Sequence, residues 1–166
     1  MAMLSKLNAL LIRIAEWLTI ASLGAVSIVV PWEVFNRYLL GEMAMWATEF
    51  DQYCLVCASM MGAAAGLHRG YQVSITSLID ALGPRAARLL QGVIFGFVLF
   101  FSGVMAWYGA VQTVENWSQV SSSMGISMSI PYASLPLGFA TMFFVTLEQF
   151  VDLCNGRLQP SRPVGA

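Results

Sequence analysis

Charged side chains are concentrated in residues 31–67, a part of the sequence that is otherwise strongly apolar. The charged residues of this stretch are Glu33, Arg37, Glu42, Glu49 and Asp51. A charge at membrane depth is costly and usually faces protein or a water-filled cavity. Such groups can form an ion pair within the chain, contact a partner protein, or bind a proton or cation.

The spacing of these residues favours ion pairs. Glu33 and Arg37 are four residues apart with the acid first, the better orientation for a helical pair. A turn at Gly41 would also bring Glu49 within reach of Arg37. We therefore predict that Arg37 pairs with Glu33 or with Glu49. Docking to a partner is the second interpretation.

A joint cation or proton site at Glu49 and Asp51 is the least favoured interpretation. Residues two apart lie on different sides of a helix, so the two carboxylates would not converge. Asp51 is expected either to pair within the structure or to be open to water outside the membrane.

Other residues that could carry chemistry have simpler explanations. The Cys54-x-x-Cys57 spacing is found in thiol redox proteins, but both cysteines would lie inside an apolar helix, with Cys154 far away. His68 is the single histidine, so a bis-histidine haem site cannot form within the chain. We find no phosphate-binding loop, catalytic triad or nucleic-acid-binding surface, and expect no enzyme activity, cofactor or metal in this chain.

Glu16 is the residue on which a different function would depend. A lone glutamate in a first membrane helix would suit a small, self-sufficient proton-coupled exporter. However, Glu16 follows Arg13 by three residues at the edge of the apolar run, where pairing and snorkelling are easy. A structural anchor subunit of some other membrane complex is a further alternative.

The composition requires a membrane protein. Of the 166 residues, 58% are hydrophobic and 10% are charged, whereas soluble domains carry about 25% charged residues. At about 20 residues per membrane helix, the chain predicts a single all-α membrane domain of four tilted spans. These spans cover about residues 14–40, 45–67, 89–114 and 131–154.

The remaining segments are short and polar or amphipathic. Residues 1–13 have helical apolar spacing and a basic side, which predicts an interfacial helix that leads into a retained first span. The connection 68–88 predicts a second amphipathic helix on the membrane surface, while residues 115–130 form a loop and 155–166 a frayed tail.

Individual residues should shape and pack the spans. Pro31 is expected to kink the first, Trp46 to anchor the second at an interface, and Ser129 to cap the last. Small residues permit close helix approach. The glycines expected to do so are Gly62, Gly66, Gly92 and Gly96.

The basic residues set the orientation. Seven of the eight lysines and arginines precede the first span, lie between the second and third, or follow the fourth, and only Arg37 lies on the other side. By the positive-inside rule, both termini and residues 68–88 are predicted to be cytoplasmic. The Gly41 turn and residues 115–130 should face outward.

Four motifs resemble a known family. They are E-x-x-x-R-Y-L-L-G at 33–41, W-x-x-E-F at 46–50, G-A-A-x-G-x-x-R-G at 62–70 and I-S-M-S-I-P-Y-A-S-L-P-L-G at 126–138. In this order and spacing they resemble the small membrane subunit, of the DctQ type, of tripartite ATP-independent periplasmic (TRAP) transporters. The resemblance covers nearly all of the chain.

The resemblance implies a division of labour in the bacterial inner membrane. A periplasmic solute-binding protein of the DctP type delivers an organic anion. The large membrane subunit of the DctM type holds the substrate and sodium sites and moves as an elevator. The small subunit packs on the large one within the lipid bilayer and helps to receive the binding protein.

Two groups of residues are then expected to meet partners. Candidates for structural ion pairs or the seam with the large subunit are Glu33, Asn36, Arg37, Tyr38, Trp46, Glu49 and Asp51. Candidates for docking the periplasmic protein are Glu42, Ser121, Ser122 and Ser123.

Overall fold

A computed structural model of the chain describes residues 2–41, 44–68 and 84–155. Within these ranges the long elements are all helices: α1 (Ala2–Phe35), α2 (Met45–His68), α4 (Pro84–Glu115) and α5 (Ser129–Cys154). A short π-helix, η1 (Asn36–Leu40), continues α1, and a 3₁₀ turn, η2 (Asn116–Ser118), follows α4. The prediction of an all-helical protein is confirmed for the described part of the chain. The predicted surface helix in 68–88 and the tail 155–166 lie almost wholly outside it.

Among the described residues, three helical segments are long and apolar enough to cross a membrane: Ser5–Leu40, Arg85–Ser118 and Ser129–Cys154. The remaining long helix, α2, has 24 residues and would be about 36 Å long, more than a hydrocarbon core of about 30 Å. It is less apolar because Glu49, Asp51 and Gln52 lie in its first half. The fourth span therefore stays a prediction.

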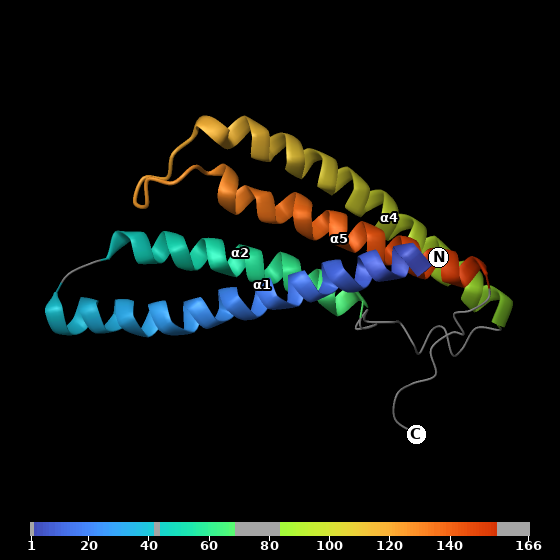
Figure 1. Cartoon of the computed structure of the whole chain (residues 1–166), viewed down its shortest axis with the longest axis horizontal. Helices are drawn as coiled ribbons and strands as arrows, with labels where there is room; N and C mark the ends of the chain where they lie inside the picture. The colour runs from blue at the N-terminus through green and yellow to red at the C-terminus, as the bar shows by residue number, and fades with distance from the viewer. Residues whose placement is uncertain (1, 42–43, 69–83, 156–166) are drawn as a thin grey trace, which may run out of the picture.

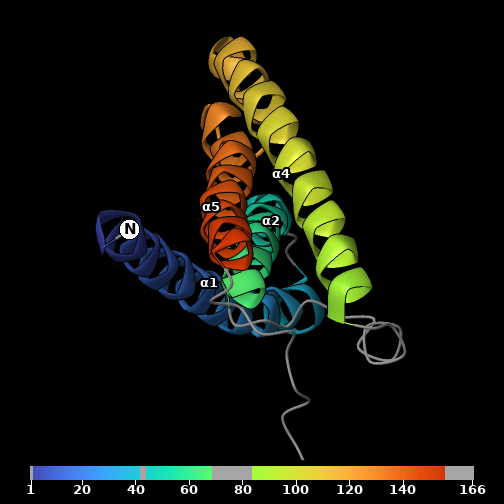
Figure 2. The same cartoon turned by 90° about the vertical axis from the view of Figure 1, so that its right-hand side faces the viewer.

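The helices form two hairpins that meet through α2 and α5. Helix α1 packs on α2, and α4 packs on α5, while α2 and α5 lie against each other between them (Figure 1). Viewed from one end, α1 and α4 flank this central pair on opposite sides (Figure 2). The N-terminus and the end of α5 lie at one end of the bundle. The η1 turn and the connection from α4 to α5 lie at the other (Figure 1).

Helix α1 is longer than the first span and runs through Pro31 without ending. The predicted interfacial segment and the first span are thus one continuous helix. The helix becomes a π-helix only at Asn36 and ends at Leu40. The next residue, Gly41, has a φ of 71°, which lies in the left-handed region. Glycine suits this position because other residues adopt positive φ at a cost.

Among the described glycines, those most tightly packed against another helix are mostly not the ones expected from the sequence. A Cβ built on Gly138 of α5 would lie 2.9 Å from Met60 Cβ of α2, and one on Gly109 would lie 3.2 Å from the Pro136 ring. Among the expected glycines, Gly62 faces Thr19 at 3.5 Å and Gly92 faces Leu153 at 3.9 Å.

The two other expected glycines, Gly66 and Gly96, would meet no heavy atom within 4 Å among the described residues. Residue spacing along a helix identifies a stripe of small residues. It does not say whether a neighbouring helix lies over that stripe.

The predicted cap at Ser129 is wrong. Ser129 is already the first residue of α5, after Met128, and no side-chain cap bond forms there. Its hydroxyl instead donates to the Thr113 carbonyl at 2.7 Å. Ser129 therefore joins the start of α5 to the last turns of α4.

A buried asparagine joins α1 to α5. Asn8 is 1% exposed, and its Nδ2 donates to the Phe144 carbonyl at 3.0 Å and to Glu148 Oε2 at 2.5 Å. The amphipathic pattern did not reveal this contact, because a polar residue in a basic segment is usually exposed.

We predict that Asn8→Leu destabilises the protein by about 1–3 kcal/mol, because it removes the amide donor to the part-buried Glu148 carboxylate and the side-chain donor to the Phe144 carbonyl. Lys6→Ala, an exposed change on the same helix, is the matched control. The melting temperature of the detergent-purified protein measures the difference. Equal melting temperatures for the two variants would contradict the prediction.

Candidate functional site

The connection between α4 and α5 is an ordered hairpin, called here the α4–α5 loop (residues 116–128). Val120 and Ser127 form an antiparallel bridge. The Ser121 amide donates to the Ile126 carbonyl at 2.8 Å, and the Met128 amide donates to the Gln119 carbonyl at 2.9 Å. Gly125 turns the tip with a φ of 66°. The backbone of the loop is therefore largely satisfied by its own hydrogen bonds.

The carboxylate of Glu49, in the second turn of α2, holds the tip of this loop. The hydroxyls of Ser121 and Ser122 donate to it, the latter at 2.9 Å, and the Met124 amide donates to Oε2 at 3.3 Å. The Met124 amide also reaches the Ser121 hydroxyl at 3.2 Å. Hydrogen bonds to an ionised carboxylate are stronger than neutral ones, so three donors on Glu49 fix the loop against α2.

A second contact lies one turn further along the same face of α2. The Tyr53 hydroxyl meets Met128 Sδ at 3.5 Å, at the base of the loop, whereas Ser121 lies at its tip. Residues four apart share a helix face, which explains why Glu49 and Tyr53 meet the same loop. The α4–α5 loop is thus attached to α2 at two positions.

Glu33 belongs to a different contact, between α1 and α2. It accepts a hydrogen bond from the Thr48 hydroxyl at 3.1 Å. Beside it, the Trp32 and Trp46 rings lie 5.6 Å apart between centroids, and the Trp46 and Phe50 rings lie 6.5 Å apart between centroids in a T-shaped arrangement. The predicted interfacial Trp46 therefore helps to close the α1–α2 hairpin.

Arg37 forms no ion pair with Glu33 or Glu49 in the part of the chain that the structure describes. Both carboxylates have other donors, and Arg37 lies in η1, whose wider π-helical turn breaks the four-residue register with Glu33. Arg37 is exposed, its neighbour Tyr38 is 78% exposed, and Asn36 is half-buried. These side chains are available to another molecule.

Asp51 lies inside the bundle instead of facing water. It is 8% exposed, and its Oδ1 has no hydrogen-bond partner among the described residues. Asp51 and Glu49 do lie on different sides of α2, as their spacing indicated. The described ranges contain no group of three histidine, cysteine, aspartate or glutamate residues placed to hold a metal ion. Cys54, Cys57 and Cys154 are free thiols.

The docking candidates differ in exposure. Ser121 is 4% exposed and turned inward onto Glu49, whereas Ser122 and Ser123 are exposed at the tip. Glu42 lies outside the described residues. The sequence did not reveal the contact between Glu49 and the loop. The one available signal was a run of three serines in a connection without lysine or arginine, on the same predicted side as the acidic start of α2.

The chain is similar in sequence to known small permease proteins of TRAP transporters. The chain is 27% identical over 150 residues to the sialic acid TRAP transporter small permease protein SiaQ of Vibrio cholerae, covering 90% of this chain and 87% of that protein. It is 24% identical to the C4-dicarboxylate TRAP transporter small permease protein DctQ of Vibrio cholerae, and the match covers 87% of this chain and 73% of that protein. It is 30% identical to the C4-dicarboxylate TRAP transporter small permease protein DctQ of Rhodobacter capsulatus, and that match covers 66% of this chain and 49% of that protein.

The family comparison covers most of the described structure. Residues 26–156 match the model of the DctQ component of tripartite ATP-independent periplasmic transporters. This range includes η1, α2, α4, the α4–α5 loop and α5. It confirms the resemblance carried by the four motifs, and the chain belongs to the DctQ family of TRAP transporter components.

Proposed function

We propose that this chain is the scaffold subunit of a TRAP transporter that imports an organic anion. It packs on a large membrane subunit of the DctM type, which holds the substrate and sodium sites, and presents the α4–α5 loop to a periplasmic solute-binding protein of the DctP type. The observation that carries this proposal is the attachment of that loop to Glu49. A loop fixed in one conformation loses little entropy when a partner docks.

The proposed topology has four spans, with both termini on the cytoplasmic side of the inner membrane. Lys6 and Arg13 lie in the first part of α1, and Arg85 and Arg88 lie in the first turns of α4. Both helices start at the end of the bundle that holds the N-terminus (Figure 1). The η1 turn and the α4–α5 loop lie at the opposite end. This distribution supports a periplasmic loop by the positive-inside rule.

We place part of the seam with the large subunit at the end of α1. Arg37 has no ion pair among the described residues, and a charge near the membrane needs a partner. Tyr38 and Leu39 beside it are 78% and 67% exposed. An arginine with exposed aromatic and aliphatic neighbours matches the composition of protein interfaces.

The alternatives have less support. A proton-coupled exporter based on Glu16 and an anchor for another complex are both disfavoured by the relatives, which are named small permease proteins of TRAP transporters. The names of those relatives concern sialic acid and C4-dicarboxylates, and they support an organic anion as the solute class.

A pull-down tests the proposal. The chain, tagged at its C-terminus, is recovered from detergent-solubilised native membranes. We expect a larger multi-span protein to co-purify in about one-to-one ratio, and the tagged chain reconstituted alone to move no solute. Recovery of this chain alone, with solute movement in vesicles, would overturn the scaffold function and favour Glu16 as a coupling residue.

A further inference from the structure

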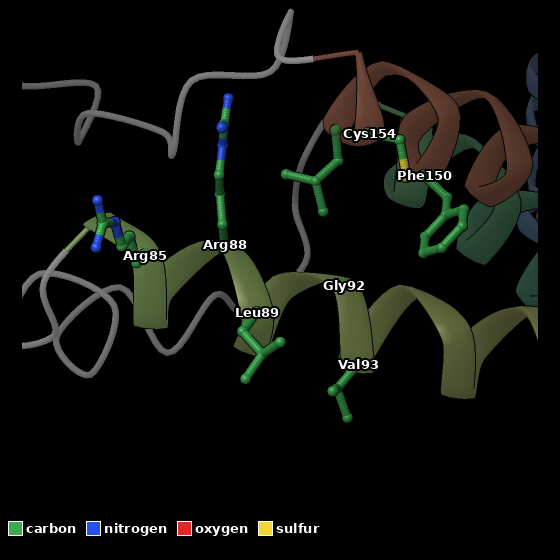
Figure 3. Close-up of a pocket in the computed structure, with 8 residues that line it drawn as sticks. Arg85, Arg88, Leu89, Gly92, Val93, Phe150 and Cys154 are labelled. Carbon is green, nitrogen blue, oxygen red and sulfur yellow. The ribbon is translucent and has the colours of Figure 1, made fainter.

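A groove of about 520 Å³ lies between the first turns of α4 and the last turns of α5 (Figure 3). Arg85 and Arg88 line the end of the groove where α4 begins (Figure 3). Leu89 and Val93 continue along α4, and Phe150 and Leu153 line the side formed by α5. The groove therefore changes from cationic to apolar along one helix.

Among the described residues, no acidic side chain lines the groove. Arg85 and Arg88 are exposed, and neither forms an ion pair with a carboxylate within residues 2–41, 44–68 and 84–155. The first turn of α4 contains no acidic residue. A helix N-terminus carries partial positive charge and disfavours cations, so two arginines there create a local excess of positive charge. An anion with several oxygen atoms would neutralise it, and phosphate fits the forked donors of arginine.

The remaining residues that line the groove are mainly apolar and suit a hydrocarbon chain. Leu89 and Val93 are 74% and 62% exposed, although both are apolar. Gly92 lies between them and has no side chain that would fill the groove. A Cβ at this position would lie 3.9 Å from Leu153 Cδ2 on the opposite side. A ligand with an anionic head and an apolar tail matches both parts of the groove.

We propose that this groove binds one anionic glycerophospholipid, with its phosphate on Arg85 and Arg88 and an acyl chain along Leu89 and Val93 against Phe150. The proposal rests on the proposed function, because the scaffold orientation places the two arginines at the cytoplasmic surface. Basic pockets between membrane helices on that side bind anionic lipid head groups. The lipid would fill the gap between α4 and α5 and stabilise the end of that hairpin.

The test uses tagged protein purified from native membranes with its co-purifying partner and titrated with phosphatidylglycerol. Native mass spectrometry counts the lipid adducts on the tagged chain. We expect Arg85→Gln with Arg88→Gln to weaken phosphatidylglycerol binding about tenfold or more, as for the loss of charge-assisted bonds. Lys6→Gln, which removes an exposed cation near the same end of the bundle, should leave binding unchanged.

Two further measurements separate the contribution of the lipid head group from that of the acyl chain. Gly92→Leu retains both arginines and fills the apolar part, so it should also weaken binding. Millimolar inorganic phosphate should not displace the lipid. Equal binding of phosphatidylcholine, equal binding by the double variant, or full displacement by phosphate would each overturn the proposal.

The two proposals fail in different ways. If the wild-type chain recovers no large subunit, the scaffold function fails whatever lipid is bound. If the double variant recovers the large subunit and binds phosphatidylglycerol like the wild type, only the lipid site fails.

Discussion

Replacing Gly138 with leucine is expected to lower the melting temperature of the detergent-purified protein by about 5–10 °C. Gly138 is buried in α5, where even a Cβ would lie 2.9 Å from Met60 Cβ and 3.3 Å from the Met60 carbonyl oxygen. These atoms belong to the backbone of α2 or are attached directly to it, so a change of rotamer cannot relieve the overlap. The two helices must separate.

The expected loss is large because of where the contact lies. Helices α2 and α5 form the joint between the α1–α2 hairpin and the α4–α5 hairpin. Separating them also moves the α4–α5 loop relative to Glu49. Gly138→Leu should therefore reduce recovery of the large subunit as well as the melting temperature.

Gly96→Leu is the matched control. Gly96 is an exposed glycine in the middle of α4, and a Cβ added there would have no described heavy atom within 4 Å. Leucine favours helix over glycine by up to about 1 kcal/mol, so the melting temperature should hold or rise. Gly138→Ala should fall between wild type and leucine. An unchanged melting temperature for Gly138→Leu would show that α2 and α5 do not pack as described.

The helical architecture could be predicted from the sequence because it depends on local pattern. Long apolar runs, a Gly41 turn and a low content of charged residues are sufficient to indicate membrane helices. Packing depends instead on which faces meet. Gly62 and Gly66 have the favoured spacing, yet only Gly62 has a described neighbour within 4 Å, and among the described glycines Gly138 and Gly109 are the most tightly packed.

Glu49, Ser121 and Ser122 were singled out from the sequence, but the contact among them was not predicted. Their role as a functional site stays a prediction. Glu49 was expected to meet Arg37, the nearest cation in sequence across the Gly41 turn. Its actual donors are hydroxyl and amide groups about 72 residues away. Spacing rules describe neighbours on one helix and carry no information on a loop that returns from another hairpin. Asn8 and Glu148 were missed for the same reason, since 140 residues separate them.

Glu49→Ala is expected to release the α4–α5 loop and to reduce solute uptake driven by the binding protein. The substitution removes the acceptor for the Ser121 and Ser122 hydroxyls and one of the two acceptors of the Met124 amide. The bridge between Val120 and Ser127 remains, so the hairpin should persist while its tip detaches from α2. Hydrogen exchange measures this directly, and the Met124 amide should exchange about tenfold faster or more.

Glu115→Ala is the control, because Glu115 is an exposed acid at the end of α4, next to the same loop. It should alter neither exchange at Met124 nor uptake, which excludes a general effect of lost negative charge. Glu49→Gln keeps one acceptor oxygen and should give an intermediate result. If Glu49→Ala accelerates exchange but leaves uptake unchanged, the loop does not receive the binding protein. If exchange at Met124 also stays slow, Glu49 does not hold the loop. Reduced uptake together with faster exchange would assign Glu49 as the residue that positions the docking loop, through a contact made wholly within the small subunit.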